Sequence, residues 1–230
     1  MITSSGFSQG APQEWKYGIQ RGKYMPVTAK KDTNDVSQRD QYVKGGIGAK
    51  YWDMRDAAIL SHIRGQDILD AGCGEGITFE RVIKAFPDAI VHGLDVDPEN
   101  IRICKQHGLN VTEGSLYDLP FADNSFDTSL LIEVIEHLES PDTALKELSR
   151  VTKPGGRVIV VFPVDWGMWL ARMLCLRWNE ARFDPGHLRQ WNFRELSAAL
   201  VCAGFVCLSQ KSLPLPFPLQ LHGLMVAVKE

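Results

Sequence analysis

The sequence predicts a doubly wound α/β fold, in which a mostly parallel sheet is covered by helices on both faces. Short apolar runs rich in Val, Ile and Leu alternate along the chain with longer segments of helical periodicity. Such runs are typical of parallel strands that are buried on both faces. A glycine-rich turn follows the first of these strands, and repeated strand–turn–helix units build a parallel sheet.

The predicted elements follow one another in order from residue 51. Apolar residues recur at helical spacing from Tyr51 to Ile63, which predicts a helix there. Pro98 marks the start of a later helix, because proline is tolerated at the first helical position. Strands are predicted at 67–71, 90–95, 110–114, 127–132, 157–162, 205–211 and 223–229, and helices at 76–85, 98–107, 141–151, 166–178 and 193–203.

Length and composition fit one domain preceded by a long arm. The chain has 230 residues, of which 44% are hydrophobic and 23% are charged, as is ordinary for a soluble globular protein. Residues 1–46 are rich in Gly, Ser, Gln and Lys and lack clear periodicity, so we expect an irregular or partly disordered arm. The domain itself is expected to span 47–230, with a lid insertion near 164–192.

Charge and cysteine content exclude several classes of protein. The net charge of −3 gives no basic footprint for nucleic acid, and we interpret the small excess of cations in residues 1–46 as a solvated arm. Five cysteines without C-x-x-C spacing argue against a disulfide framework or a zinc site. Without a secretory signal or an apolar run of membrane-spanning length, we expect a cytoplasmic protein.

The turn after the first strand indicates a cofactor. Residues 72–76 read G-C-G-E-G, whereas a dinucleotide fingerprint would need its third glycine at Ile77. Asp70 precedes the turn, and its carboxylate would repel a pyrophosphate but attract an α-amino group. Asp95 ends the second strand, where an acid can bind ribose hydroxyls. The loop therefore fits S-adenosylmethionine, which has an amino group, a ribose and no phosphate, better than NAD.

These residues resemble the first motif of class I S-adenosylmethionine-dependent methyltransferases. Asp118–Asp127 (D-L-P-F-A-D-N-S-F-D) and Lys153–Arg157 (K-P-G-G-R) fit the same family. The most similar group is the type 11 methyltransferases, which include enzymes of ubiquinone and menaquinone synthesis. The resemblance covers about Tyr51 to Phe205. It implies a Rossmann-like seven-stranded sheet of order 3-2-1-4-5-7-6, with the last strand antiparallel.

The resemblance also implies a set of cofactor-binding residues at the carboxyl ends of the first four strands. The backbone of the glycine turn would lie along the methionine part, and Val96 would pack on the adenine. Many relatives have Asp where Ser115 stands, and an uncharged hydroxyl makes a weaker acceptor for the adenine amino group. The full predicted set is Asp70, Gly72, Cys73, Gly74, Asp95, Val96, Ser115, Leu116 and Glu133.

Two histidines are the predicted catalytic residues. His137 follows the fourth strand, where the acceptor side of the pocket should begin, and His187 precedes the helix at 193–203. A general base is needed only where the acceptor holds a proton of high pKa. Arg189 could pair with an anionic substrate or simply be a surface cation; we favour the surface cation.

A metal-assisted O-methyltransferase is an alternative, although our first interpretation assigns no metal. Residues 133–137 read E-V-I-E-H, and in a helix Glu133, Glu136 and His137 would share one face. Together with His187 they would supply two carboxylates and two imidazoles, which suit a divalent cation. Such a metal would polarise a hydroxyl acceptor.

The apolar segment 166–178, rich in Trp and Met, should select the acceptor. It is too short to span a bilayer, so it packs in the core, lines an apolar pocket or touches a membrane surface. The stiff loop 213–218 is a second candidate wall. We therefore expect methyl transfer to a small, partly apolar or lipid-like acceptor. A cofactor-binding scaffold without catalysis is a further alternative, and an NAD-linked oxidoreductase a distant one; the oligomeric state is not predicted.

Overall fold

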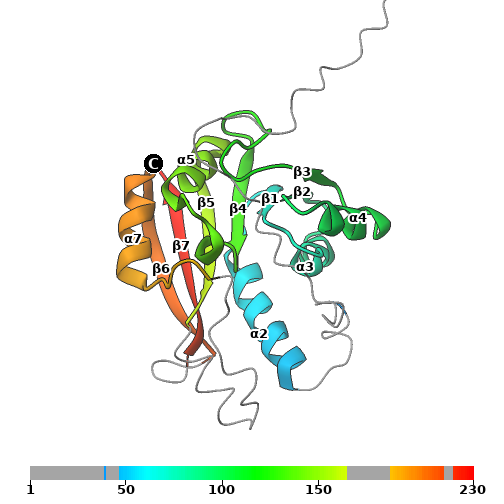
Figure 1. Ribbon diagram of the computed structural model, residues 1–230, viewed down its shortest axis with the longest axis horizontal. Helices are drawn as coiled ribbons and strands as arrows, with labels where there is room; N and C mark the ends of the chain where they lie inside the picture. The colour runs from blue at the N-terminus through cyan, green and yellow to red at the C-terminus, as the bar shows by residue number, and fades with distance from the viewer. Residues whose placement is uncertain (1–38, 40–46, 165–186, 215–219) are drawn as a thin grey trace, which may run out of the picture. The chain divides into compact units, whose positions relative to one another are not determined.

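A computed structural model describes residues 39, 47–164, 187–214 and 220–230 of the chain. Seven strands form one sheet in the order β3-β2-β1-β4-β5-β7-β6 (Figure 1), which confirms the predicted doubly wound α/β fold. The strands are β1 (Asp67–Ala71), β2 (Ile90–Asp95), β3 (Val111–Glu113), β4 (Phe126–Ile132), β5 (Thr152–Pro163), β6 (Phe205–Pro214) and β7 (Gln220–Lys229). The helices are α2 (Ile47–His62), α3 (Ile77–Ala85), α4 (Pro98–Gln106), α5 (Pro141–Val151) and α7 (Phe193–Cys202), with a 3₁₀ turn η1 (Ile135–His137).

The strand directions bring one set of strand ends to a common edge of the sheet. β1 pairs in parallel with β2 and with β4, and β4 pairs in parallel with β5. β7 runs antiparallel to both β5 and β6, as predicted for the last strand. Pro163, the last residue of β5, is therefore in register with His222 near the start of β7. The carboxyl ends of the parallel strands and the amino end of β7 lie at the same edge.

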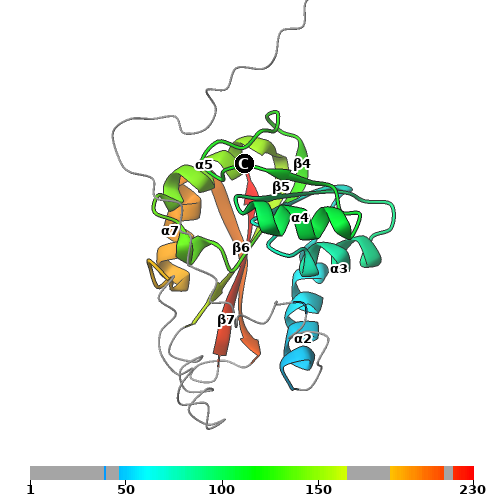
Figure 2. The same cartoon turned by 45° about the vertical axis from the view of Figure 1, so that its right-hand side comes forward.

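Alternate residues of the strands point into two separate hydrophobic cores. One core joins Leu69 and Val160 to α5 and α7, and the other joins Ile68 and Ile159 to α2, α3 and α4. Figures 1 and 2 show α5 and α7 grouped on one side of the sheet and α3 and α4 on the other. This two-sided burial explains why the strands read as continuous apolar runs.

Local sequence fixes where two of the helices begin. Asp97 caps α4, because its side chain accepts a hydrogen bond from the backbone N–H of Glu99 at 2.9 Å, and Pro98 occupies the first helical position. Asn192 caps α7 in the same way, accepting from the N–H of Glu195 at 3.0 Å. Both caps place their helices as the sequence predicts.

At the opposite edge of the sheet, Asp127 holds three segments together. Its Oδ2 accepts hydrogen bonds from the backbone N–H groups of Gln66 and Asp67, each at 3.0 Å. Its Oδ1 lies 2.8 Å from the Lys153 ammonium. The Asp127 and Lys153 motifs of the family resemblance are therefore structural here and lie away from the predicted cofactor.

The predicted boundaries differ from the structure mainly in β5 and β6. β5 begins at Thr152 instead of 157, because Thr152 already pairs with Phe126 and the register shifts across the glycine turn before resuming at Arg157. β6 continues to Pro214 beside β7. Apart from Arg39, the predicted arm lies outside the described residues, as do the 166–178 helix and residues 215–218 of the proline-rich loop.

Two further expectations concern thiols and membranes. Cys73, Cys104, Cys202 and Cys207, which are the cysteines in the described part of the chain, are free thiols. None of the helices in those same ranges is long and apolar enough to cross a membrane.

We expect Asp127→Ala to lower the free energy of unfolding by about 1 to 3 kcal/mol, because two backbone donors and Lys153 lose their acceptor. Urea unfolding measures the change. Asp123→Ala is the control: this carboxylate is 69% exposed and pairs with Arg150, so its loss should cost less than about 1 kcal/mol. Equal effects of the two substitutions would contradict the assignment.

Candidate functional site

The glycine turn between β1 and α3 is fixed by the end of β2. Gly72, Gly74 and Gly76 have φ angles of 81°, 55° and 80°, a left-handed region that glycine enters without strain. The backbone N–H groups of Gly72 and Cys73 donate to the Leu94 carbonyl at 2.7 and 3.0 Å. These hydrogen bonds fix the turn against the end of β2.

Only part of this turn is covered by other side chains. A Cβ atom at Gly72 would lie 2.5 Å from Cγ2 of Val134, whereas a Cβ atom at Gly74 would meet nothing within 4 Å. The Cys73 side chain is buried and lies beside Cys104, whose Sγ is 3.3 Å from the Gly74 carbonyl. The open side of the turn is thus at Gly74, and the Cys73 thiol points into the core.

Asp70 is a buried carboxylate beside this opening. It is 2% exposed, and its Oδ2 has no hydrogen-bond partner among the described residues. Burial, together with the nearby Asp95 and Asp56 carboxylates, raises the pKa of Asp70 to about 7, and Arg55 only partly opposes this increase. A buried acceptor without a partner is costly, so this site is suited to a cationic ligand group.

Asp95 links the glycine turn to α4 and keeps one acceptor position for a ligand. Its Oδ2 accepts from the Gly74 N–H at 2.8 Å, while its Oδ1 accepts from the Asp97 N–H at 2.9 Å and from the Asn100 amide at 3.2 Å. A carboxylate has about four lone-pair positions. The remaining position on Oδ2 can accept one hydroxyl of a ribose.

The residues predicted around the adenine have different surroundings. Val96 is 73% exposed directly after β2, which leaves its side chain available for a flat ring. The Ser115 hydroxyl accepts from the Tyr117 N–H at 3.1 Å and can still donate. The Leu116 side chain is buried in the core beside α5 and α7, so it can offer only its backbone to a ligand.

Arg39, from the predicted arm, contacts the outer side of the turn. Its Nε donates to the Glu75 carbonyl at 2.8 Å, and a terminal nitrogen lies 2.9 Å from Glu80 on α3. A second terminal nitrogen lies 3.3 Å from Nδ1 of His107. This residue thus joins the turn, α3 and the end of α4.

A chain of charged groups that the sequence analysis missed lies next to Asp70. Arg55 on α2 is 8% exposed and pairs with Asp56 at 2.8 Å and with Glu133. Asp56, itself 1% exposed, also pairs with Arg81 on α3. The signal was present in the sequence, because Arg55 lies one helical turn after Tyr51 on the apolar face of α2, where a charge is rarely buried without a partner.

Glu133, predicted as a cofactor contact, has a φ of 54° in the bend after β4. Its Oε1 accepts from Arg55 and lies 3.2 Å from Nε2 of His222. The opposite ring nitrogen of His222 is hydrogen-bonded to the Tyr51 hydroxyl. Burial raises the pKa of Glu133, but His222 and Arg55 outweigh it and hold that pKa well below its usual range.

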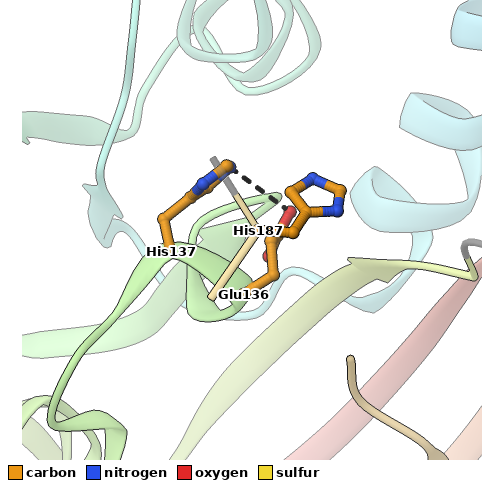
Figure 3. A group of neighbouring side chains, drawn as sticks. All are labelled: Glu136, His137 and His187. Carbon is orange, nitrogen blue, oxygen red and sulfur yellow. Dashed lines mark ion pairs between the residues drawn. The ribbon is translucent and has the colours of Figure 1, made fainter. Parts of the chain in front are cut away.

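The two predicted catalytic histidines lie together. The ring centroids of His137 and His187 are 5.0 Å apart. Glu136, His137 and His187 each offer one ligand atom, and these three atoms all lie within 4.8 Å of one another (Figure 3). Glu136 is 2% exposed, and its Oε1 is 3.9 Å from Nε2 of His137. The expectation that Glu133 shares a helical face with these residues is wrong, because the helical turn η1 begins only at Ile135.

Backbone contacts bring His187 to this place. The N–H groups of Leu188 and Arg189 donate to the Glu136 carbonyl at 2.9 and 3.2 Å. The Trp191 indole N–H donates to the Ile135 carbonyl at 3.3 Å. Arg189 is half exposed, lies over the Trp191 ring at 4.1 Å and is 3.7 Å from Glu195, which agrees with our interpretation of a surface cation.

Part of the chain is similar in sequence to known methyltransferases. Residues 69–160 match the family model described as a methyltransferase domain. A probable S-adenosylmethionine-dependent methyltransferase of Mycolicibacterium smegmatis is 28% identical over 72% of this chain and 63% of its own length. The rice protein 2-methyl-6-phytyl-1,4-hydroquinone methyltransferase 1 is 32% identical over 57% of this chain and 43% of its own length. The chain thus spans about half the length of these curated relatives.

The fold is also found in solved structures. An S-adenosylmethionine-dependent methyltransferase of Thermotoga maritima superimposes with a TM-score of 0.64 at 20% identity, over 84% of this chain and 96% of that one. At this identity the likeness concerns the fold alone. Residues 69–160 thus resemble a methyltransferase domain in sequence, and the strand order β3-β2-β1-β4-β5-β7-β6 is the one that this resemblance implies.

Proposed function

We propose that this protein transfers a methyl group from S-adenosylmethionine, by in-line displacement, to a small and partly apolar acceptor. One observation carries the proposal. The Asp70 carboxylate is buried, its Oδ2 has no hydrogen-bond partner among the described residues, and it lies near the uncovered backbone of Gly74. A cationic amino group fits the carboxylate, and a backbone without a side chain allows close approach.

The remaining cofactor contacts follow the order of the strand ends. Asp95 accepts a ribose hydroxyl at its open lone pair, and Val96 packs against the adenine. Ser115 and the backbone of Leu116 lie at the adenine edge, and the Gly72–Gly74 backbone runs along the methionine part. Contacts of Cys73 and Glu133 with the cofactor would come from the Cys73 backbone and from Glu133 Oε2, because the Cys73 thiol and Glu133 Oε1 already face other residues.

Positioning supplies much of the rate in such a displacement, about 7 to 11 kcal/mol in favourable cases. The rice relative is named for a phytyl-substituted hydroquinone, which supports an acceptor with an apolar part and a hydroxyl group. Alkylated hydroquinones are therefore the first acceptors to test. A protein that binds the cofactor but methylates no acceptor in a broad panel would instead be a scaffold or sensor.

As a second candidate, we propose a metal-assisted O-methyltransferase that uses Glu136, His137 and His187. The convergence of one carboxylate and two imidazoles favours it (Figure 3), since this donor set suits Zn²⁺, Mn²⁺ or Fe²⁺. A bound metal would lower the pKa of a coordinated hydroxyl acceptor. Glu133 is not part of this set, because it contacts Arg55 and His222.

Two glycine substitutions test the cofactor site. Gly74→Ala should fold, losing about 1 kcal/mol to the left-handed backbone, but should weaken S-adenosylmethionine binding by more than about tenfold. Gly72→Ala should instead be destabilised by about 2 to 4 kcal/mol, because its Cβ meets Val134. Titration calorimetry and urea unfolding measure the two effects; tight binding by Gly74→Ala would contradict the proposed site.

Cofactor affinity should depend on pH through Asp70. In the free protein this carboxyl holds its proton below about pH 7, and it must lose that proton to pair with an ammonium group. Affinity should therefore weaken as the pH falls from about 7 to 5, approaching about tenfold per pH unit. Calorimetry in buffers of different ionisation enthalpy should detect one released proton at low pH. A wild-type affinity that is flat over this range, or an Asp70→Asn variant that keeps the slope, would exclude Asp70 as the ammonium partner.

Metal content separates the second candidate from the first. If the second candidate is correct, protein that has been stripped with a chelator should bind about one equivalent of added Zn²⁺ or Mn²⁺. The His187→Ala variant should bind none. His92→Ala, on the distant strand β2, should bind as wild type. Cofactor binding should survive chelation in every case. Methyl transfer that persists in strong chelator, with no metal bound, would eliminate this candidate and leave the histidines to act without metal.

A further inference from the structure

Three side chains, of which the sequence analysis singled out only Glu133, form a connected chain of polar contacts at the ligand edge of the sheet. The Tyr51 hydroxyl is hydrogen-bonded to Nδ1 of His222, and their rings stack with centroids 5.6 Å apart at 25°. Nε2 of His222 lies 3.2 Å from Oε1 of Glu133. Residues from α2, the bend after β4 and the start of β7 are thereby placed in one line.

The positions of the protons in this chain follow from Glu133. Its carboxylate also accepts from Arg55, and an ionised carboxylate can only accept hydrogen bonds. Nε2 of a neutral His222 therefore carries the proton and donates to Glu133. Nδ1 is then the acceptor, so the Tyr51 hydroxyl donates to it. The order of groups is O–H, imidazole, carboxylate, which is the order that lets a histidine take a proton from a hydroxyl.

The surroundings of His222 favour this role. It is 3% exposed, and its register neighbours on β5 and β6 are Pro163 and Leu213, neither of which titrates. Within the described residues, the titratable and charged groups in its printed contacts are Tyr51, Glu133 and, across Glu133, Arg55. A protonated His222 would have the Glu133 carboxylate at one ring nitrogen and the Tyr51 oxygen at the other.

The chain lies beside the proposed cofactor site. Arg55, which contacts Glu133, also lowers the pKa of Asp70, so the two carboxylates are near the same guanidinium. Glu133 follows β4, next to β1 in the sheet, and His222 is level with the end of β5. Figure 1 shows α2 running past the end of β7 that is opposite to the C-terminus. Tyr51 and Glu133 are both only partly buried, whereas His222, which lies between them, is buried.

We propose that Tyr51, His222 and Glu133 form a proton relay for methyl acceptors that carry a hydroxyl group, with Tyr51 touching the acceptor. The acceptor proton passes to the Tyr51 oxygen while the Tyr51 proton passes to Nδ1 of His222. The acceptor oxygen forms its bond to the methyl carbon as the bond from that carbon to the sulfonium sulfur breaks. The products are a methyl ether, a neutral thioether and a protonated His222, which returns its proton to water. This inference rests on the proposed methyl transfer.

The relay predicts which acceptors need it. Burial and the Glu133 carboxylate raise the pKa of Tyr51 far above its usual value, so Tyr51 stays protonated and passes a proton on without storing charge. A hydroxyl acceptor has a proton of high pKa to lose, whereas a carboxylic acid is already ionised at neutral pH. The relay should therefore accelerate hydroxyl methylation and leave carboxylate methylation unchanged.

The test compares dodecylhydroquinone with dodecanoic acid, which share an alkyl chain, in the full-length protein. Tyr51→Phe should lower kcat/KM for the hydroquinone by about 100-fold or more, within the usual range for general base catalysis, and change that for the acid by less than about threefold. Tyr117→Phe removes another partly buried hydroxyl, which accepts from the N–H groups of Glu139 and Ser140, and should change neither. Calorimetry should show unchanged S-adenosylmethionine binding by Tyr51→Phe.

A second measurement does not need turnover. Nitrogen NMR of the imidazoles, with the protein bound to S-adenosylhomocysteine and His222 assigned from His222→Gln, should show an unprotonated Nδ1 and a protonated Nε2 in the neutral form of His222. A proton on Nδ1 in that form, or equal losses of rate for both acceptors in Tyr51→Phe, would overturn the relay. Loss of cofactor binding by the wild-type protein would instead contradict the proposed function itself.

Discussion

The candidate site depends on a buried arginine that holds several carboxylates at one edge of the sheet. Asp56 and Glu133 both contact Arg55, and Asp70 and Asp95 lie close enough for their charges to affect one another. Without a cation these groups would repel and take up protons. A buried ion pair contributes little net stability, because its desolvation offsets its attraction. Its value here is geometric, since it orients Glu133 toward His222 beside Asp70, whose Oδ2 has no hydrogen-bond partner among the described residues.

The proposed site has two halves that are fixed by different physical means. The donor half, around the glycine turn, is proposed to bind S-adenosylmethionine, and the acceptor half, around Tyr51 and Glu133, is proposed to bind the methyl acceptor. Backbone hydrogen bonds fix the donor half, because the glycine turn is tied to Leu94 and Asp95 at the neighbouring strand end. Long side chains from distant segments fix the acceptor half, so it depends on α2 packing against the sheet. A change in α2 that leaves Arg55 in place should therefore disturb the acceptor half and spare the donor half, which keeps cofactor binding and acceptor chemistry separable.

The sequence was sufficient for the fold and for the strand ends at which the proposed donor half lies. The fold could be predicted because strands and helices have different hydrophobic periodicities. Asp70 and Asp95 could be singled out because each lies at the end of an apolar run that predicts a strand. The acceptor half could not be predicted in the same way. Tyr51 and His222 are 171 residues apart and Arg55 and Glu133 are 78 apart, and no local pattern encodes such pairs. The pattern E-x-x-E-H was misread as one helical face because a left-handed residue at Glu133 separates it from the turn that follows.

Glu133 belongs to one of the two clusters on the acceptor side, the relay of Tyr51 and His222, and not to the other, which is Glu136, His137 and His187. Its Oε1 is shared by Arg55 and His222, so it completes the relay and leaves Glu136, His137 and His187 as a separate set of three. Both sets would solve the same chemical problem, which is the high pKa of a hydroxyl acceptor. The relay removes the proton to a neighbouring base, whereas a metal lowers the pKa so that no strong base is needed. Because either suffices alone, a protein that uses the relay has no need of a metal at Glu136, and the three residues can then serve to fix the chain at His187 over η1.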